Sequence, residues 1–120
     1  MSRQIAVNTA VTLDELLDFV RPRHHAIVIT ARADGQPQAS PVTCALAEGR
    51  IVIATYPERA KTRNARRNQR VSVVVLSDDF SGPWVQVDGR AEVRQGKSLL
   101  RVTPVRWGPV ATGGFPARLA

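Results

Sequence analysis

The chain has 120 residues, of which 43% are hydrophobic, so its apolar content suits one ordinary core. This length excludes a TIM barrel, which takes about 250 residues, and a dinucleotide fold with a separate substrate domain. The single cysteine excludes an internal disulfide and any CxxC zinc or redox site. We therefore expect one domain over residues 1–120.

The net charge is +7, from 17 Lys and Arg against 10 Asp and Glu. Such a balance favours a polyanionic partner, which could be nucleic acid, an acidic membrane surface, or a phosphorylated or polycarboxylate ligand. Solvated surface charge is the alternative. Asp14 and Glu15 precede any apolar run, which argues against a signal peptide, and no run is long enough for a transmembrane helix. We expect a cytoplasmic protein.

The first expected element is a short amphipathic helix over residues 12–20. Thr12 and Glu15 have the spacing of a capping box, and Pro22 ends the helix soon after its last apolar residue. The apolar residues recur at helical spacing, at Leu13, Leu16, Leu17 and Val20.

Three β-strands joined by tight turns are expected next. Asp34-Gly35 and Glu48-Gly49 are typical hairpin turns. Pro41 lies inside the second strand, which indicates a sheet edge or a bulge at that point. The runs of β-branched and apolar residues predict these strands at residues 25–31, 38–46 and 50–55.

The second half of the chain begins with a basic helix over residues 58–68 and ends in an irregular tail over residues 108–120. Gly89 lies in phase with the alternating apolar residues around it, so we expect a kink inside one long strand. Three further strands are expected at residues 71–76, 84–93 and 99–107. Antiparallel strands with short turns predict a small, mainly β barrel.

The basic helix is the strongest functional signal. Its six cations and one acidic residue, between Glu58 and Arg70, supply more than two thirds of the net charge. A solvated surface helix is one interpretation. A clamp for phosphate or polycarboxylate groups is the other, because Arg pairs in bidentate fashion and Lys supplies a point charge. Helical spacing places five cations on one face, Arg59, Arg63, Arg66, Arg67 and Arg70, with Lys61 off it.

Other reactive residues give little support for catalysis by side chains. His24 and His25 are adjacent, so on a strand they point to opposite faces and cannot easily share a metal. Asp78 and Asp79 lie in a Gly/Pro loop, where they are typical turn residues. Nothing near Cys44 in the sequence would activate its thiol. We expect no metal and no catalytic side chain, so a bound cofactor would carry any redox chemistry.

The order of motifs resembles the split-barrel flavin and deazaflavin proteins related to pyridoxamine 5′-phosphate oxidase. The nearest branch is the small coenzyme F420-dependent reductases. A Lys-x-x-Asn pattern, Lys61 to Asn64, follows a strand that ends in Thr55. The resemblance covers about residues 12 to 107, and its matching segments are 34–42, 53–55, 59–68, 71–73, 84–91 and 103–104.

The resemblance implies a six-stranded antiparallel split β-barrel of the FMN-binding type, which works as a homodimer with its cofactor groove at the interface. It places Arg59 and Lys61 on the cofactor phosphate. The other implied cofactor contacts are Ser40, Pro41 and Val42 beside the ring, Ala54 and Thr55 beside the phosphate, Asn64 from the Lys-x-x-Asn pattern, and Trp84 and Gln86 from the second subunit.

FMN and coenzyme F420 share the ring and phosphate positions, but the deazaflavin also carries an oligoglutamate tail. The extra cations Arg63, Arg66 and Arg67 favour the deazaflavin. The resemblance then implies hydride transfer to a small conjugated acceptor. An FMN-dependent oxidoreductase and a non-catalytic cofactor carrier remain alternatives. A specific nucleic-acid binder is disfavoured, because none of the six aromatic residues (three Phe, two Trp, one Tyr) interleaves the basic run.

Two departures from the family pattern are visible. Ala65 stands where the family usually has Leu, which costs some packing. The family usually carries a helical insertion before the last strand, where this chain has only residues 94–98, so either the element is lost or the chain is interrupted there. We expect a two-fold dimer that buries more than about 1,200 Å², with Val71 to Leu76 and Trp84 to Val87 on its face.

Overall fold

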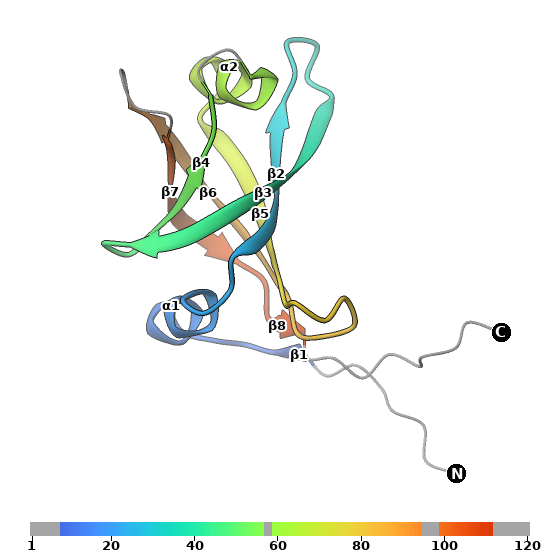
Figure 1. Cartoon of the computed structure of the whole chain (residues 1–120), viewed down its shortest axis with the longest axis vertical. Helices are drawn as coiled ribbons and strands as arrows, with labels where there is room; N and C mark the ends of the chain where they lie inside the picture. The colour runs from blue at the N-terminus through green and yellow to red at the C-terminus, as the bar shows by residue number, and fades with distance from the viewer. Residues whose placement is uncertain (1–7, 57–58, 95–98, 112–120) are drawn as a thin grey trace, which may run out of the picture.

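The computed structural model describes residues 8–56, 59–94 and 99–111 of the chain. Its main feature is a closed six-stranded barrel in which every neighbouring pair of strands is antiparallel (Figure 1), and this confirms the predicted fold. The strand order is β2-β3-β4-β7-β6-β5. The strands are β2 (His25–Ala31), β3 (Pro37–Ala47), β4 (Arg50–Ala54), β5 (Arg70–Leu76), β6 (Val85–Val93) and β7 (Leu99–Trp107).

The barrel interior is filled by branched aliphatic side chains. In β5, Val71, Val73 and Val75 are buried, whereas Ser72 and Val74 point outward and are half-buried. This alternation follows from the two-residue period of a strand. Fully buried residues from the other strands complete the core: Val28, Ile51, Ile53, Val85, Val87, Leu100 and Val102.

β3 is long and divides its pairing between two neighbours. Residues Pro37 to Thr43 pair with β2, and Cys44 to Ala47 pair with β4. Among the described residues, the first half of β3 therefore has one edge without a strand partner. Pro41 can lie there because its missing N–H can point to the unpaired edge. The prediction that Pro41 marks a sheet edge is confirmed.

Gly89 lies at a bulge between β6 and β7. The register shifts at this point, because Asp88 pairs with Arg106 whereas Gly89 pairs with Pro104. A Cβ atom at Gly89 would lie 2.4 Å from the carbonyl oxygen of Thr103, so only glycine allows the two backbones to approach this closely. The predicted kink within one continuous strand is confirmed.

The two helices lie at opposite ends of the barrel (Figure 1). α1 (Leu13–Val20) begins after Thr12, whose side chain and that of Glu15 form the predicted capping box. α2 (Ala60–Arg67) packs against β2 and β6, with Ala65 fully buried. Glu58, the first residue of the predicted basic helix, lies outside the described residues. No helix in the described part of the chain is long and apolar enough to cross a membrane.

The predicted irregular tail needs a correction. Val110–Ala111 forms a short strand, β8, which pairs antiparallel with β1 (Asn8–Thr9) beside the barrel. Trp84, predicted to open β6, instead bridges to Ala111 through two backbone hydrogen bonds of 2.9 Å. Two-residue strands carry no periodic signal, so tertiary pairing alone creates them. The rest of the tail, 112–120, lies outside the described residues.

The short connection expected over residues 94–98 lies mostly outside the described residues, at 95–98. The strands on either side of it are direct antiparallel neighbours, and Val93 pairs with Leu100. Whether the chain is interrupted within residues 95–98 would be read from the spacing of their Cα atoms, which lie outside the described residues.

Candidate functional site

The start of α2 is attached to the end of β4 by a pair of buried threonines. The Oγ1 atoms of Thr55 and Thr62 lie 3.2 Å apart, and the Thr62 hydroxyl also donates to the Tyr56 carbonyl at 2.8 Å. Both threonine side chains are buried. These contacts fix the N-terminal end of α2 beside Ala54 and Thr55, two of the residues implied to surround a phosphate.

Asn64 anchors α2 to the barrel. Its amide nitrogen donates to the Thr30 hydroxyl at 3.0 Å and to Gln38 Oε1 at 2.8 Å. Its oxygen accepts from Arg67 Nη2 at 2.7 Å, and the same nitrogen donates to the Ala31 carbonyl at 3.3 Å. The buried Asn64 amide is thus engaged with the protein itself. The structure gives Asn64 and Arg67 structural contacts that the sequence analysis did not foresee.

The N-terminal end of α2 is rich in cations. Arg59 is the N-cap residue, and its guanidinium lies 5.8 Å from the centroid of the Tyr56 ring. Among the described residues no side chain caps the helix, and its first turn contains no acidic residue. Lys61 is half-buried, and Arg66 is exposed. Arg70 opens β5, so it does not share the helical face that its spacing predicted.

Ion pairing distinguishes these cations from the arginines of the strands. Arg50, Arg101 and Arg106 each have a carboxylate within 4.0 Å, from Glu92, Glu48 and Asp88 respectively. In the described ranges, no carboxylate lies at that distance from Arg59, Lys61 or Arg66. The α2 end of the barrel therefore has positive charge that the described chain does not neutralise.

The three β3 residues implied to flank a cofactor ring do not share one face. Pro41 is exposed and pairs with Ile27, while Ser40 and Val42 alternate to the opposite side and are half-buried. Across the barrel surface, Ile27 in turn pairs with Val74, which is also half-buried. Pro41, Ile27 and Val74 thus form an outward apolar row.

Strand alternation limits which residues of the predicted dimer face point outward. Of the two segments expected to form it, the residues that point outward are Ser72, Val74 and Leu76 on β5 and Gln86 on β6, and Trp84 before β6 is exposed as well. The valines between them fill the barrel core. Only every second residue of the predicted face is therefore available to a partner, as strand alternation requires.

A groove of about 720 Å³ runs over the outside of β2, β5, β6 and β7. Gln86 belongs to its lining, and no other residue of the implied cofactor set does. Asp88 also lines it, and its Oδ1 accepts from the Ser72 hydroxyl at 2.7 Å and from Gln86 Nε2 at 3.2 Å. Its Oδ2 accepts from Arg106 Nε at 3.2 Å and Nη2 at 2.9 Å.

These contacts hold the pKa of the Asp88 carboxyl below its ordinary value, chiefly through the hydrogen bond from Ser72 and, with it, those from Arg106 and Gln86, against the opposing effect of burial. The sequence analysis missed Asp88 and Arg106. Strand alternation could have placed Asp88 on the same face as Gln86. The pairing with Arg106 depends on the register shift at Gly89, which the sequence pattern does not specify.

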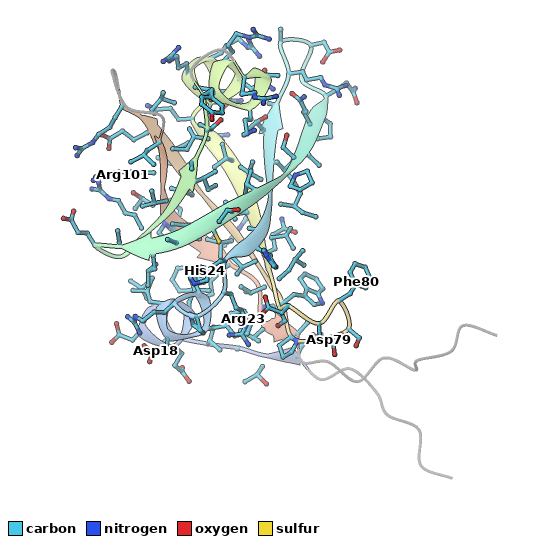
Figure 2. The ribbon with its side chains drawn as sticks, viewed as in Figure 1. Asp18, Arg23, His24, Asp79, Phe80 and Arg101 are labelled. Atoms are coloured by element: carbon cyan, nitrogen blue, oxygen red, sulfur yellow. The ribbon has the colours of Figure 1, made fainter. Side chains whose placement is uncertain are left out.

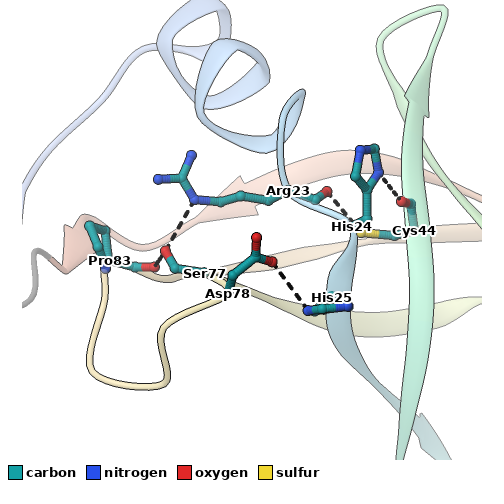
Figure 3. Close-up of polar contacts among 7 residues, drawn as sticks. All are labelled: Arg23, His24, His25, Cys44, Ser77, Asp78 and Pro83. Carbon is teal, nitrogen blue, oxygen red and sulfur yellow. Dashed lines mark hydrogen bonds and ion pairs between the residues drawn. The ribbon is translucent and has the colours of Figure 1, made fainter.

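The residues set aside as catalytic candidates lie near the α1 end of the barrel, where Figure 2 labels Arg23, His24 and Asp79. His24 Nδ1 lies 2.9 Å from the Cys44 carbonyl, and His25 Nδ1 lies 3.4 Å from Asp78 Oδ1 (Figure 3). Burial raises the pKa of the Cys44 thiol, which opposes thiolate chemistry. The described residues contain no group of three metal-ligating side chains.

Comparison with known proteins identifies the family to which this fold belongs. The family model for pyridoxamine 5′-phosphate oxidase matches residues 12–108. The chain belongs to this family. The resemblance stated from the sequence is thereby confirmed.

Individual relatives agree with the family assignment. The F420H(2)-dependent biliverdin reductase of Mycobacterium tuberculosis is 29% identical over 102 residues, which are 84% of this chain and 74% of the reductase. A solved F420 reductase superposes with a TM-score of 0.64 at 19% identity, covering 82% of this chain and 98% of that one. A FAD-binding protein from Mesorhizobium loti gives 0.70 at 19%, covering 91% and 98%. At these identities the two structures support the fold alone.

Proposed function

We propose that the chain is an oxidoreductase that uses coenzyme F420 and works as a homodimer. The observation that carries the proposal is the cationic, uncapped N-terminal end of α2, held against the end of β4. Membership of the family and similarity to an F420H(2)-dependent reductase support a flavin or deazaflavin cofactor. The excess of cations supports the deazaflavin, whose oligoglutamate tail adds carboxylates.

The residues present suit a phosphate group. The N–H groups at the start of a helix carry partial positive charge. At the start of α2, those of Arg59 and Thr62 donate to backbone carbonyls, and those of Ala60 and Lys61 have no hydrogen-bond partner among the described residues and can face an anion. Lys61 and Arg59 add full charges at the same end, and Thr55 and Ala54 border it. We assign the phosphate to Lys61 and Arg59. Asn64 is left out of this set because its amide is bound to Thr30, Gln38 and Arg67.

The tail of the cofactor is assigned to the outer cations of α2. Arg66 is exposed and has no ion-pair partner in the described part of the chain, so it can receive a carboxylate. Arg63 is exposed as well but already has a contact within the chain. Arg67 contributes less than its position in the sequence suggests, because Nη2 already donates to Asn64 and Ala31.

When bound, the reduced cofactor supplies a hydride, which a conjugated acceptor takes up together with a proton from solvent. The protein binds the cofactor, orients its ring and shields it from water. No side chain is assigned an acid, base or nucleophile role. The weak candidates at the α1 end, His25 with Asp78 and the Cys44 thiol, lie at the opposite end of the barrel from α2 (Figures 1 and 3).

The homodimer is proposed because the site is divided within one chain. Trp84 and Gln86 line hollows to which the α2 cations Arg59 and Lys61 do not contribute. The apolar row of Pro41, Ile27 and Val74 offers a face that a second copy would cover. A two-fold partner seated there would bring its Trp84 and Gln86 toward a ring beside Pro41, whereas Ser40 and Val42 face the other side of β3.

Titration of the purified protein with F420 and with FMN, followed by cofactor fluorescence, tests the proposal. We expect the deazaflavin to bind more tightly, and we expect reduced F420 to be oxidised when a conjugated acceptor is added. If FMN binds more tightly than F420, the cofactor of the proposal is FMN and not F420. Binding of F420 without any turnover over a panel of acceptors would make the protein a carrier. Light scattering at micromolar concentration should give the mass of a dimer. The mass of a monomer would contradict the proposal that two subunits share the cofactor groove.

A further inference from the structure

Both tryptophans of the chain line one pocket of about 430 Å³ at the α1 end of β6 and β7. Trp84 is partly exposed, and Trp107 is half-buried and fixed by a hydrogen bond from Nε1 to the Val11 carbonyl at 2.9 Å. Pro109 and Ala111 add further apolar lining. Trp107 pairs with the buried Val87 and packs against the core, so the exposed Trp84 supplies the aromatic wall of the pocket. A pocket of this size with an aromatic wall suits a flat, conjugated molecule.

The polar side of the pocket is formed by the Asp88 cluster. Gln86, Asp88 and Arg106 line both this tryptophan pocket and the 720 Å³ groove, so they form the boundary between the two hollows. Asp88 receives the Nε and Nη2 donors of Arg106. The Arg106 side chain is nevertheless 82% exposed, and a guanidinium has donors on its other edge, including both on Nη1.

The charge at this boundary favours an anion. Arg70 and Arg90 join Arg106 in the groove, while Asp88 is the only acidic residue among the described lining residues of the two hollows. Asp88 therefore holds the Arg106 guanidinium in place and leaves positive charge in excess. An oriented guanidinium recognises a carboxylate through paired, charge-assisted hydrogen bonds.

We propose that the tryptophan pocket is the acceptor site and that it selects planar, conjugated molecules carrying a carboxylate, with the ring against the exposed Trp84 and the carboxylate on Arg106. This inference rests on the proposed function, because the ligand is the acceptor of that reaction and meets the cofactor only if the proposed dimer brings the Trp84 end of one subunit to the cofactor ring held by the other. One conjugated double bond of the acceptor gains a hydride from reduced F420 and a proton from water, and the cofactor leaves oxidised. The carboxylate is a handle for binding and does not react.

The pocket can be tested without cofactor, because the only two tryptophans of the chain report on it. The probes are trans-cinnamate and cinnamamide, which have the same planar shape and differ in charge. Binding is followed by tryptophan fluorescence, with excitation at the red edge of tryptophan absorption, and by calorimetry. We expect cinnamate to bind at least tenfold more tightly than cinnamamide.

Arg106→Gln should weaken cinnamate binding at least tenfold and leave cinnamamide binding unchanged, and Arg106→Lys should restore part of the loss. Arg50→Gln is the matched control, because Arg50 is also a strand arginine paired with a carboxylate but lines neither hollow. It should change neither affinity. Thermal unfolding of each variant checks the fold, which should persist because the Arg106 side chain is exposed.

Equal affinity for the two probes, no binding of either, or an Arg106→Gln variant that binds cinnamate normally would overturn the inference. These outcomes are independent of the F420 titration. If F420 binds and cinnamate does not, the acceptor site is wrong and the proposed function stands. If cinnamate binds through Arg106 and F420 does not bind, the pocket is an aromatic-carboxylate site and the proposed function fails.

Discussion

The two helices have the same length but carry opposite charge at their N-terminal ends. The first turn of α1 contains Asp14 and Glu15, and its N-cap is a complete capping box. The first turn of α2 contains no acidic residue, no side chain in the described part of the chain caps it, and Arg59 and Lys61 lie at its start. Negative charge stabilises a helix N-terminus and positive charge destabilises it, by about 0.3–1 kcal/mol per group. α1 is thus optimised for folding, whereas α2 is arranged to receive an anion.

The helices also differ in how they are attached to the barrel. α1 buries the apolar side chains Leu16 and Val20, as an amphipathic helix does. α2 is held largely by polar contacts, in which Asn64 reaches Thr30 and Gln38. Buried hydrogen bonds fix orientation more closely than apolar contacts do. A binding element benefits from fixed orientation, so this difference is consistent with the role proposed for α2.

The largest effect is expected at Lys61. Lys61→Ala should weaken F420 binding by about ten- to a hundredfold, because a charge-assisted contact contributes about 1.5–3 kcal/mol. The melting temperature of the cofactor-free protein should hardly change, since no described carboxylate pairs with Lys61. Fluorescence titration and thermal unfolding measure the two quantities. A large loss of stability with unchanged affinity would make Lys61 structural.

At the other helix the effect should be on stability alone. Thr12→Ala removes the side-chain half of the capping box and should lower the free energy of unfolding by about 1 kcal/mol. Affinity for F420 should remain that of the wild type, because α1 lies at the opposite end of the barrel (Figure 1). Denaturant unfolding and cofactor titration check this pair of results. A cofactor defect in Thr12→Ala would break the contrast between the helices.

The variant Arg66→Ala tests whether Arg66 contacts the glutamate tail of F420 or its phosphate. Because Arg66 is exposed, its loss should weaken F420 binding by only about two- to fivefold. FMN lacks the glutamate tail, so its affinity should not change. Parallel titrations with both cofactors give the answer. An equal loss of affinity for F420 and FMN would show that Arg66 contacts the phosphate. Unchanged affinity for both cofactors would show that Arg66 is only a solvated surface residue.

The smallest effect concerns acid stability at Asp88. Its pKa is lower in the folded protein than its ordinary value of 3.8, so the unfolded chain takes up the proton first as the pH falls. The stabilisation is therefore complete above that value and is lost as the pH falls through the folded pKa. Asp88→Asn should be less stable than the wild type at neutral pH, and the difference should shrink in acid. Denaturant unfolding across the acid range measures it, and a constant difference would contradict the assignment.

Sequence reasoning succeeds where local pattern and tertiary structure agree. The capping box at Thr12, the edge position of Pro41 and the kink at Gly89 each have a short-range cause, and each is present. The anchoring role of Asn64 was not predictable, because its partners are 34 and 26 residues away in the chain. The Asp88–Arg106 pair was missed since it depends on which residue the bulge leaves unpaired.

The most direct test of the central claim is Arg59→Asp, which gives α2 the kind of N-cap that α1 already has. The extended backbone at Arg59 suits a capping carboxylate. The account predicts that the cofactor-free variant is more stable than the wild type by about 1 kcal/mol, and that it binds F420 at least tenfold more weakly. A variant that loses stability, or that gains stability and keeps wild-type affinity for F420, would contradict the claim that the end of α2 is arranged for the cofactor anion.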